Sequence, residues 1–431
     1  MVDRQLIEIL TADAVELLKE MVAIPSPSFS ESAVCDHISG WMTERGLVHE
    51  RIGNNIIAGH IIDPAKPTLM LCAHIDTVSP SEGYDFDPYE PHDDVAADVI
   101  SDMTGVDVGP DDIVAGLGSN DDGASVVSML AAYRAFITDI NVSRENCEGR
   151  GGIQNNPSHF VGSSPCGQGG STVLDTAPAS ASFLSEIGIS NVMLVLTCEE
   201  ERSGKNGMTG LWGTRLGRRN TCTEDSAETV IDYAIVGEPT GMKAATSERG
   251  LLVIDATAYG VSGHAARNEG DNALYIALED IARLKAHEFE KLSPRMGKVN
   301  LNVTQINAGT AHNVIPDRCD FVIDIRPTEQ YTNEDILQEL QAICRSELKP
   351  RNLANRSSAT FSGSPLQKAA ETLGIETFSS PTTSDWMRIS CDAVKMGPGE
   401  SSRSHRKNEF VLVSEIREAI ETYINFINHI L

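Results

Sequence analysis

The 431-residue sequence lacks most of the features that distinguish membrane, disulfide-rich and nucleic-acid-binding proteins. No stretch approaches the ~18 consecutive apolar residues that a membrane-spanning helix needs. The nine cysteines contain no Cys-x-x-Cys pair, so neither a cysteine zinc site nor a disulfide framework is indicated. Lys and Arg number 34 against 62 Asp and Glu, and the net charge of −28 excludes nucleic acid as an expected partner, because phosphate backbones attract basic surfaces.

The N-terminal segment lacks the unbroken apolar region of a signal peptide. Acidic and basic residues alternate there with Leu and Ile, a pattern that predicts an amphipathic helix. Hydrophobic residues make up 41% of the chain and charged residues 22%, which is typical of a soluble globular protein of two or three domains. We therefore expect a cytoplasmic protein with no membrane association.

Basic residues are absent from one long stretch, since no Lys or Arg occurs between Lys66 and Arg134. Twelve acidic residues lie from Asp85 to Asp122 within it. The favoured interpretation is a solvated loop that keeps the protein soluble. The alternative is a negative field that attracts metal ions or a cationic substrate.

The first part of the chain alternates helical and strand patterns. Its strands are continuously apolar, which predicts a mostly parallel sheet covered by helices on both faces. Residues 138–190 interrupt the pattern, are rich in Gly, Ser, Asn and Pro, and are interpreted as a surface insertion. We expect helices near 5–22, 31–46 and 123–137, and strands near 55–61, 68–75, 192–197 and 232–236.

From about residue 247 the order becomes strand, helix, strand, strand, helix, strand. This order predicts a small ferredoxin-like α/β domain, with Thr332 as the N-cap of its second helix. The chain then returns to the first domain with a helix near 364–373, a strand near 391–396 and a final helix from Ser414. The predicted division is a first domain from 1–246 and 359–431, and an inserted domain at 247–358.

Five short motifs carry His or carboxylate side chains, and at least three of them directly follow predicted strands. Taken singly, each is better explained as a turn, a cap or a surface pair. Together they supply the ligands that a pair of metal ions needs, and ligands in open α/β sheets gather at the carboxyl ends of strands. The motifs are HIDTVSP with His74 and Asp76, GLGSNDDG with Asp121, CEEERSG with Glu200 and Glu201, GEPT with Glu238, and GPGESSRSH with His405.

In this order, and with SGHAAR added, the motifs resemble those of the M20 family of metallopeptidases. The resemblance is greatest to the branch of acetylornithine deacetylase and succinyl-diaminopimelate desuccinylase, and it covers the chain except for 138–190. It implies that His74 and Glu238 bind one metal and Glu201 and His405 the other, with Asp121 bridging both. It further implies that Asp76 orients His74, that Glu200 is the general base, and that a cis peptide follows Asp121. The three consecutive acids leave the assignment of Glu200 and Glu201 open to a shift of one residue.

The resemblance also implies a role for the inserted domain. His264, in SGHAA, matches a His that reaches the active site of a partner subunit, so a homodimer joined through the inserted domains is expected. Asn313 and Arg326 match substrate-binding positions, and an Arg can hold a carboxylate in a fork of two hydrogen bonds. Ser384, in SPTTSD, is a further expected substrate-binding residue.

The implied reaction is hydrolysis of an N-acyl amino acid with two divalent ions, zinc or alternatively cobalt. N-acetylornithine in arginine biosynthesis is the favoured substrate. Within the same chemistry, N-succinyl substrates, acetylcitrulline, aminoacylase activity and carboxypeptidase or dipeptidase activity stay open. The alternative of another class is a metal-free binding or scaffold protein, which the filled set of ligand positions disfavours.

Overall fold

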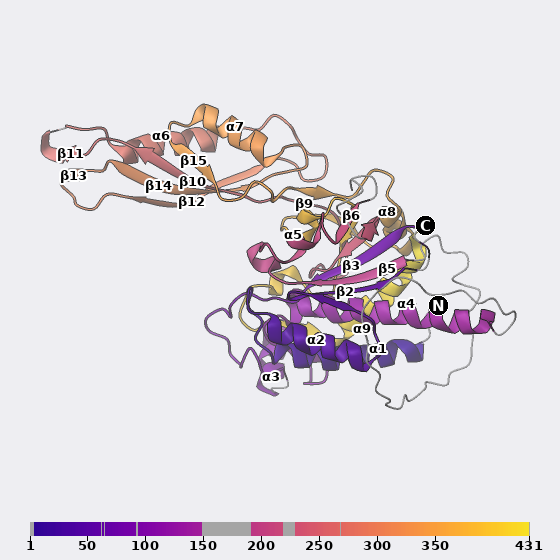
Figure 1. Cartoon of the computed structure of the whole chain (residues 1–431). Coiled ribbons are helices and arrows are strands. Elements are labelled where there is room, and N and C mark those ends of the chain that lie inside the picture. Colours follow the sequence, from indigo (N-terminus) through magenta and orange to yellow (C-terminus); the bar gives the residue numbers. More distant parts are fainter. Residues whose placement is uncertain are drawn as a thin grey trace.

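The computed structural model describes residues 4–61, 63, 65–91, 94–148, 191–218, 229–267 and 269–430. It contains two bodies, each built on its own sheet, and the smaller extends away from the larger (Figure 1). We call the part with the nine-stranded sheet the core domain and the part with the four-stranded sheet the inserted domain. The chain leaves the large sheet after β9 (Ala244–Glu248) and rejoins it at β16 (Ser358–Ala359).

The large sheet is parallel at its centre and antiparallel toward its edges. Neighbouring strands run in the order β1-β2-β5-β3-β8-β18-β9-β16, with β17 paired to β9. The pairs β5–β3, β3–β8 and β8–β18 are parallel, while β1–β2, β2–β5, β18–β9 and β9–β16 are antiparallel. The remaining strands of this sheet are β1 (Glu50–Ile52), β2 (Asn55–His60), β3 (Thr68–His74), β5 (Asn191–Thr197), β8 (Tyr233–Val236), β17 (Thr377–Ser380) and β18 (Asp392–Lys395).

Both faces of the central strands are buried, as continuous apolar runs predict. In β3, Leu69 and Leu71 join the core formed with the long helices, while Met70 and Cys72 join a second core on the opposite face with Trp386. Helices α1, α4 and α9 contact one another on the first face (Figure 1). The helices of this domain are α1 (Arg4–Val22), α2 (Ser32–Glu44), α3 (Asp94–Thr104), α4 (Ala124–Glu148), α5 (Met208–Leu211), α8 (Pro365–Leu373) and α9 (Val413–His429).

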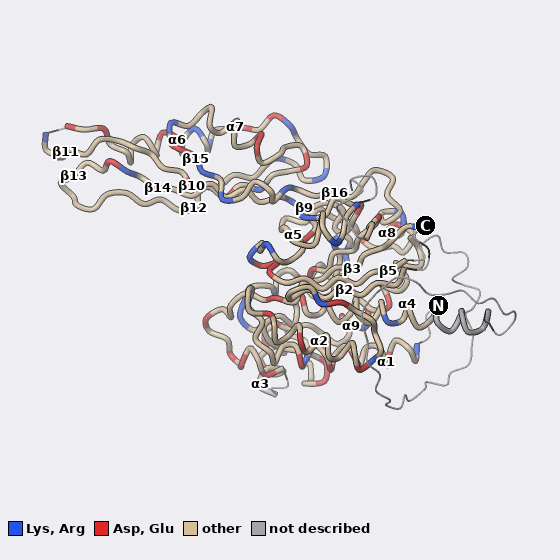
Figure 2. The backbone as a smooth tube through the Cα atoms, viewed as in Figure 1, with Lys and Arg blue, Asp and Glu red and all other residues tan. Residues whose placement is uncertain are grey.

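Two features of the core domain differ from the expectations. The acidic stretch was interpreted as a loop, but it contains α3, because Ala96, Ala97 and Ile100 pack into a small apolar cluster with Phe86. Acidic residues colour the chain around this helix in Figure 2. Helix α4 continues to Glu148 instead of ending near 137, and the rest of the expected insertion, 149–190, lies outside the described residues.

A short two-stranded sheet lies beside the site described below. It pairs β4 (Ile113–Ala115) with β19 (Phe410–Leu412) in antiparallel register, with Phe410 opposite Ala115. A second small sheet pairs β6 (Leu216–Arg218) with β7 (Thr229–Ile231). None of the helices in the described part of the chain is long and apolar enough to cross a membrane.

The inserted domain has the expected order of strands and helices. Its antiparallel sheet runs β12-β14-β10-β15, and its core joins the inward side chains of the sheet to α6 and α7. Thr332 caps α7 in a capping box with Asp335, as predicted. The elements are β10 (Leu252–Tyr259), α6 (Ala273–Ala286), β12 (Asn300–Ala308), β14 (Arg318–Arg326), α7 (Asn333–Ile343) and β15 (Glu347–Pro350), with β11 (Gly263–His264) paired to β13 (Val314–Ile315) at the tip.

Candidate metal centre

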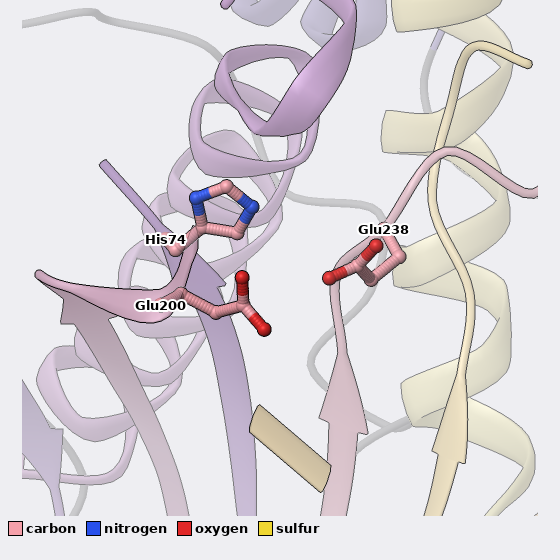
Figure 3. A group of neighbouring side chains, drawn as sticks. All are labelled: His74, Glu200 and Glu238. Carbon is pink, nitrogen blue, oxygen red and sulfur yellow. The ribbon is translucent and has the colours of Figure 1, made fainter. Parts of the chain in front are cut away.

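Three neighbouring parallel strands end at the same place and each delivers a polar side chain. His74 is the last residue of β3, Glu200 follows β5, and Glu238 follows β8. Because the strands run in parallel register, their carboxyl ends meet at one edge of the sheet. One ligand atom from each of the three residues lies within 4.8 Å of the others, and Figure 3 shows the two carboxylates and the imidazole around a common space.

Asp121 lies between two histidines and offers one carboxylate oxygen to each. Its Oδ1 is 3.3 Å from Nε2 of His74, and its Oδ2 is 3.7 Å from Nε2 of His405. Nε2 of His405 is also 2.9 Å from Oε1 of Glu201. A carboxylate in this position can bridge two cations, each held from the far side by one of the histidines.

The loop that carries Asp121 is packed too closely for side chains at its glycines. Gly118 has φ +79°, and a Cβ there would lie 2.5 Å from a methyl group of Thr77. A Cβ on Gly123 would lie 2.4 Å from the carbonyl oxygen of Gly118. The Asp121–Asp122 peptide bond is cis, which confirms the prediction.

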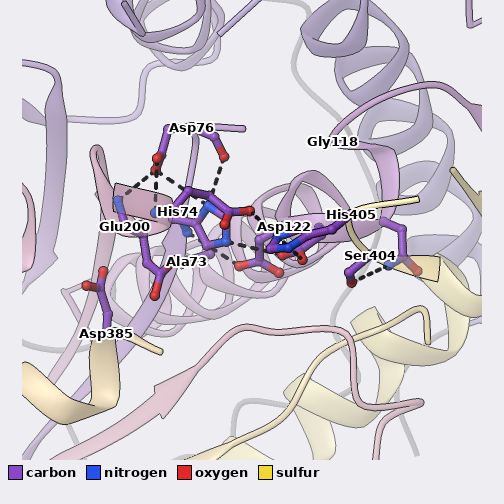
Figure 4. Close-up of polar contacts among 12 residues, drawn as sticks. Ala73, His74, Asp76, Gly118, Asp122, Glu200, Asp385, Ser404 and His405 are labelled. Carbon is purple, nitrogen blue, oxygen red and sulfur yellow. Dashed lines mark hydrogen bonds and ion pairs between the residues drawn. The ribbon is translucent and has the colours of Figure 1, made fainter. Parts of the chain in front are cut away.

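Asp76 fixes both the histidine and the acidic turn. The imidazole Nδ1 of His74 is 2.9 Å from the backbone carbonyl of Asp76 and 3.5 Å from its carboxylate. The carboxylate accepts hydrogen bonds from the backbone N–H groups of Glu200 and Glu201 and from the hydroxyl of Ser28. Figure 4 shows Asp76 beside His74 and Glu200, with dashed lines that mark its polar contacts. Asp76 therefore positions the turn that carries both acids, in addition to the ring of His74.

Buried acids dominate the electrostatics of this site. Burial raises the pKa of Glu200 and of Glu238 well above the usual value, and burial raises the pKa of Asp122 to about 7. The hydrogen bond to Glu201 raises the pKa of His405 to about 9. Burial alone would lower the pKa of His74, but its hydrogen bonds to Asp121 and Asp76 raise it overall.

This set of donors fits divalent cations. It consists of imidazole nitrogens and carboxylate oxygens, which are the ligands of catalytic zinc sites. The groups His74–Glu200–Glu238 and His74–Asp121–Glu201 each bring three such atoms within 4.8 Å of one another. Crowded carboxylates repel one another, and cations between them would remove that repulsion.

The expected residues of the inserted domain divide between its two ends. His264 and Asn313 lie together at the exposed tip, where the backbone carbonyl of Asn313 accepts a hydrogen bond from the N–H of Ala265. In Figure 1 this tip, with β11 and β13, points away from the core domain of the same chain. Arg326 ends β14 at the other end of the sheet, and its guanidinium forms two hydrogen bonds with the carboxylate of Asp324.

Ser384 lies inside the core domain and is fully buried. Its hydroxyl donates a hydrogen bond of 2.7 Å to Glu248 and accepts one from the N–H of Trp386. Its neighbour Asp385 lies beside Glu200 in Figure 4 and accepts a hydrogen bond of 2.7 Å from Thr197. Burial raises the pKa of Asp385 to about 6.

Sequence reasoning missed Asp385 and a second buried acid, Glu409, at this site. Glu409 accepts hydrogen bonds from the backbone N–H groups of Gly118, Asn120 and Asp121. Its signal in the sequence was an acid directly before the apolar run FVL, four residues after His405.

Comparison with known proteins gives independent evidence on the family. The model of the M20 peptidase dimerisation domain matches residues 246–352. An acetylornithine deacetylase of Myxococcus xanthus is 29% identical over 52% of this chain and 61% of its own length. A succinyl-diaminopimelate desuccinylase of Halorhodospira halophila is 25% identical over 56% of this chain and 66% of its own length. The alignments thus span somewhat less than two thirds of either relative.

Solved structures share the fold over almost the whole chain. An M20 family metallo-carboxypeptidase of Sulfolobus solfataricus aligns with a TM-score of 0.63 over 97% of this chain and 99% of its own, at 14% identity. A dinuclear metal binding peptidase of the M20 family from Bacillus subtilis aligns with a TM-score of 0.59 over 98% of both chains, at 13% identity. The matched dimerisation domain, the two relatives in sequence and the shared two-domain α/β fold all make this chain similar to the M20 family peptidases.

Proposed function

We propose that the chain is a metal-dependent amidohydrolase that removes the acyl group from an N-acyl amino acid. The observation that carries this proposal is the position of Asp121 between His74 and His405. Glu201 contacts His405 on one side, and Glu238 lies near His74 on the other. Such an arrangement suits two cations around a shared carboxylate.

In this proposal His74 and Glu238 hold one divalent ion, Glu201 and His405 hold the other, and Asp121 bridges them. Zinc is the proposed metal, with cobalt as the alternative, because imidazole and carboxylate ligands suit both. The ions, when bound, polarise the amide carbonyl and lower the pKa of a bound water toward neutrality.

Glu200 is the proposed general base and then general acid. Its carboxylate lies within 4.8 Å of the ligand atoms of His74 and Glu238, and Asp76 holds its backbone N–H. It would take a proton from the attacking water and deliver it to the nitrogen of the leaving amine. Glu200 lies close enough to His74 and Glu238 to bind metal with them. Variants of Glu200 and Glu201 must therefore show which of the two binds metal and which is the general base.

The inserted domain is proposed to complete the site from a second subunit. His264 and Asn313 sit at the tip that points away from their own core domain, so they would serve the site of a partner in a homodimer. His264 would stabilise the oxyanion that forms during attack on the amide. Arg326 would bind the substrate carboxylate in place of its present partner Asp324. Ser384 would contribute to substrate binding through the adjacent residue Asp385.

The favoured substrate is N-acetylornithine, which the reaction would convert to ornithine and acetate in cytoplasmic arginine biosynthesis. The name of the Myxococcus relative supports an N-acetyl substrate. The name of the Halorhodospira relative supports an N-succinyl amino acid as the second candidate.

A substrate panel tests this proposal. The zinc-loaded and cobalt-loaded protein is assayed with N-acetylornithine, N-acetylcitrulline, N-succinyl-diaminopimelate, other N-acyl amino acids and dipeptides, with the Glu200→Gln variant as control. We expect deacylation that the control lacks, with the highest kcat/KM for acetylornithine. Peptide cleavage without deacylation would contradict the proposed substrate class.

A further inference from the structure

The loop that carries Asp121 is held by a buried carboxylate, that of Glu409. Glu409 has only 1% of its surface exposed, and one of its two carboxylate oxygens, Oε1, accepts three backbone hydrogen bonds. The donors are the N–H groups of Gly118 at 3.1 Å, Asn120 at 3.0 Å and Asp121 at 3.0 Å. One side chain thus accepts three of the backbone N–H groups of the loop that ends in Asp121.

The position of Glu409 is itself set by the small β4–β19 sheet. Phe410 opens β19 opposite Ala115, the last residue of β4. One residue further out, the N–H of Gly116 donates a hydrogen bond of 2.8 Å to the backbone carbonyl of Glu409. The ladder therefore places Glu409 directly beside the start of the loop, and its carboxylate reaches over the following five residues.

The same short segment carries His405. The region 405–409 is tied to the neighbouring loop through Ser81, which donates to the carbonyl of His405, and through Asn408, which bonds the backbone and carboxylate of Asp85. Residues 400–404 also bind the side chain of Asn120. A single piece of chain therefore positions a ligand of one metal and the bridging carboxylate.

We propose that Glu409 is a positioning residue that fixes Asp121 between the two metal positions and so sets the affinity of the paired site. This inference rests on the proposed two-metal function. A carboxylate is suited to this task, because it accepts several N–H groups at once and its charge strengthens each bond. Without it, three buried N–H groups of the loop lose their partner, and the loop no longer has one preferred position.

The inserted domain offers a matched control. Asp280 in α6 is fully buried, and its carboxylate accepts the backbone N–H groups of Arg345 and Ser346 at 2.8–3.1 Å. It makes the same kind of contact with a loop, but it does so in the other domain. Substitutions of Asp280 therefore report the general cost of removing such a carboxylate.

The test measures zinc affinity by competition with a chelating dye, and the visible absorption of the cobalt-loaded protein, without any substrate. The variants are Glu409→Ala, Glu409→Gln, Asp280→Ala and Asp280→Asn, each checked for folding by circular dichroism. We expect Glu409→Ala to lose about 10–100-fold in zinc affinity, as is usual for groups that orient ligands, and Glu409→Gln to lose less. The cobalt spectrum should change in both Glu409 variants, and neither quantity should change in the Asp280 variants.

Unchanged zinc affinity in Glu409→Ala would overturn the inference. If that variant does not fold, unchanged zinc affinity in Glu409→Gln would overturn it. A loss of zinc affinity in an Asp280 variant equal to that in the Glu409 variants would also overturn it. Since no substrate is used, a protein that binds two ions normally but hydrolyses none of the panel would contradict the proposed activity and leave this inference standing.

Discussion

The imidazole of His405 and the carboxylate of Glu201 are in direct contact, with 2.9 Å between Nε2 and Oε1, although 204 residues separate them in the chain. His405 lies near Oδ2 of Asp121, whereas His74 lies near Oδ1. Both atoms are those that would coordinate the second ion. Their contact makes this half of the site the most direct place to separate metal binding from catalysis.

Glu201→Ala and Glu200→Ala should differ in kind. Glu201→Ala should lower the bound metal from two ions to about one per chain. It removes one of the two side chains, Glu201 and His405, that bind only the second ion. Glu200→Ala should keep both ions and lose about 10²–10⁴-fold in kcat, the usual contribution of a general base. Metal analysis together with kcat separates the two outcomes.

Glu199→Gln is the matched control in the same run of acids. Its carboxylate accepts two hydrogen bonds from Asn206 instead of facing the metal centre. It should therefore keep both ions and near-normal turnover. If Glu200→Ala lost metal while retaining turnover per bound ion, the roles of Glu200 and Glu201 would be exchanged.

Metal binding should release a proton from His405. The hydrogen bond to Glu201 raises the pKa of His405 to about 9. In the metal-free protein this imidazole is therefore protonated at pH ~7.5, which is about one and a half pH units below that pKa. Coordination requires the neutral ring, so affinity should rise with pH up to about 9. Calorimetry in buffers of different ionisation enthalpy would measure the released proton, and His405→Gln should reduce it.

The stability of the metal-free protein should depend on the same group, but it should fall as the pH rises, whereas metal affinity should rise. A folded pKa above the unfolded one gives stability that is complete below about pH 6.5 and is lost as the pH rises through about 9. The melting temperature of the metal-free protein should therefore fall over this window, and less so in His405→Gln. A flat profile in both proteins would show that the His405–Glu201 contact does not exist in solution.

Active sites shared between subunits should show complementation. A homodimer formed from Glu200→Ala and His264→Ala protomers contains one site with an intact base and an intact His264 of the partner. Random mixing should restore about a quarter of the wild-type activity, since about half the dimers are mixed and each holds one intact site. Activity no greater than that of the separate variants would exclude a contribution of His264 across the interface.

The strand ends could be predicted because each apolar strand stops at the polar motif that follows it. His74, Glu200 and Glu238 fall at the ends of β3, β5 and β8, and parallel register then brings them together without further information. The motif order, through its resemblance to a known family, supplied Asp121 and His405. The first argument uses residues that are adjacent in the sequence, and the second uses the order of motifs along the chain.

The contribution of Glu409 could not be predicted in this way. Its bond to the N–H of Asp121 spans 288 residues and exists only because β4 pairs with β19, two strands of three residues each. Helix α3 was missed for a related reason. The acids among its apolar residues favoured a loop, and the cluster around Phe86 that buries Ala96, Ala97 and Ile100 forms only through tertiary packing.

The capping box of α7 gives a test of the inserted domain that leaves the metal centre untouched. Thr332 accepts a hydrogen bond from the N–H of Asp335, and Asp335 accepts one from the N–H of Thr332. Thr332→Ala should destabilise the protein by about 1 kcal/mol, the usual cost of losing an N-cap. Denaturant unfolding should show this loss, with zinc stoichiometry unchanged, whereas Thr332→Ser should be close to wild type.

The most direct measurement is a crystal structure of the zinc-loaded protein with anomalous scattering recorded at the zinc edge. We expect two peaks per chain, about 3.5–4 Å apart, with one oxygen of Asp121 directed at each. His74 and Glu238 should contact one peak, and Glu201 and His405 the other. A single peak, or two peaks that do not share Asp121, would contradict the proposed centre.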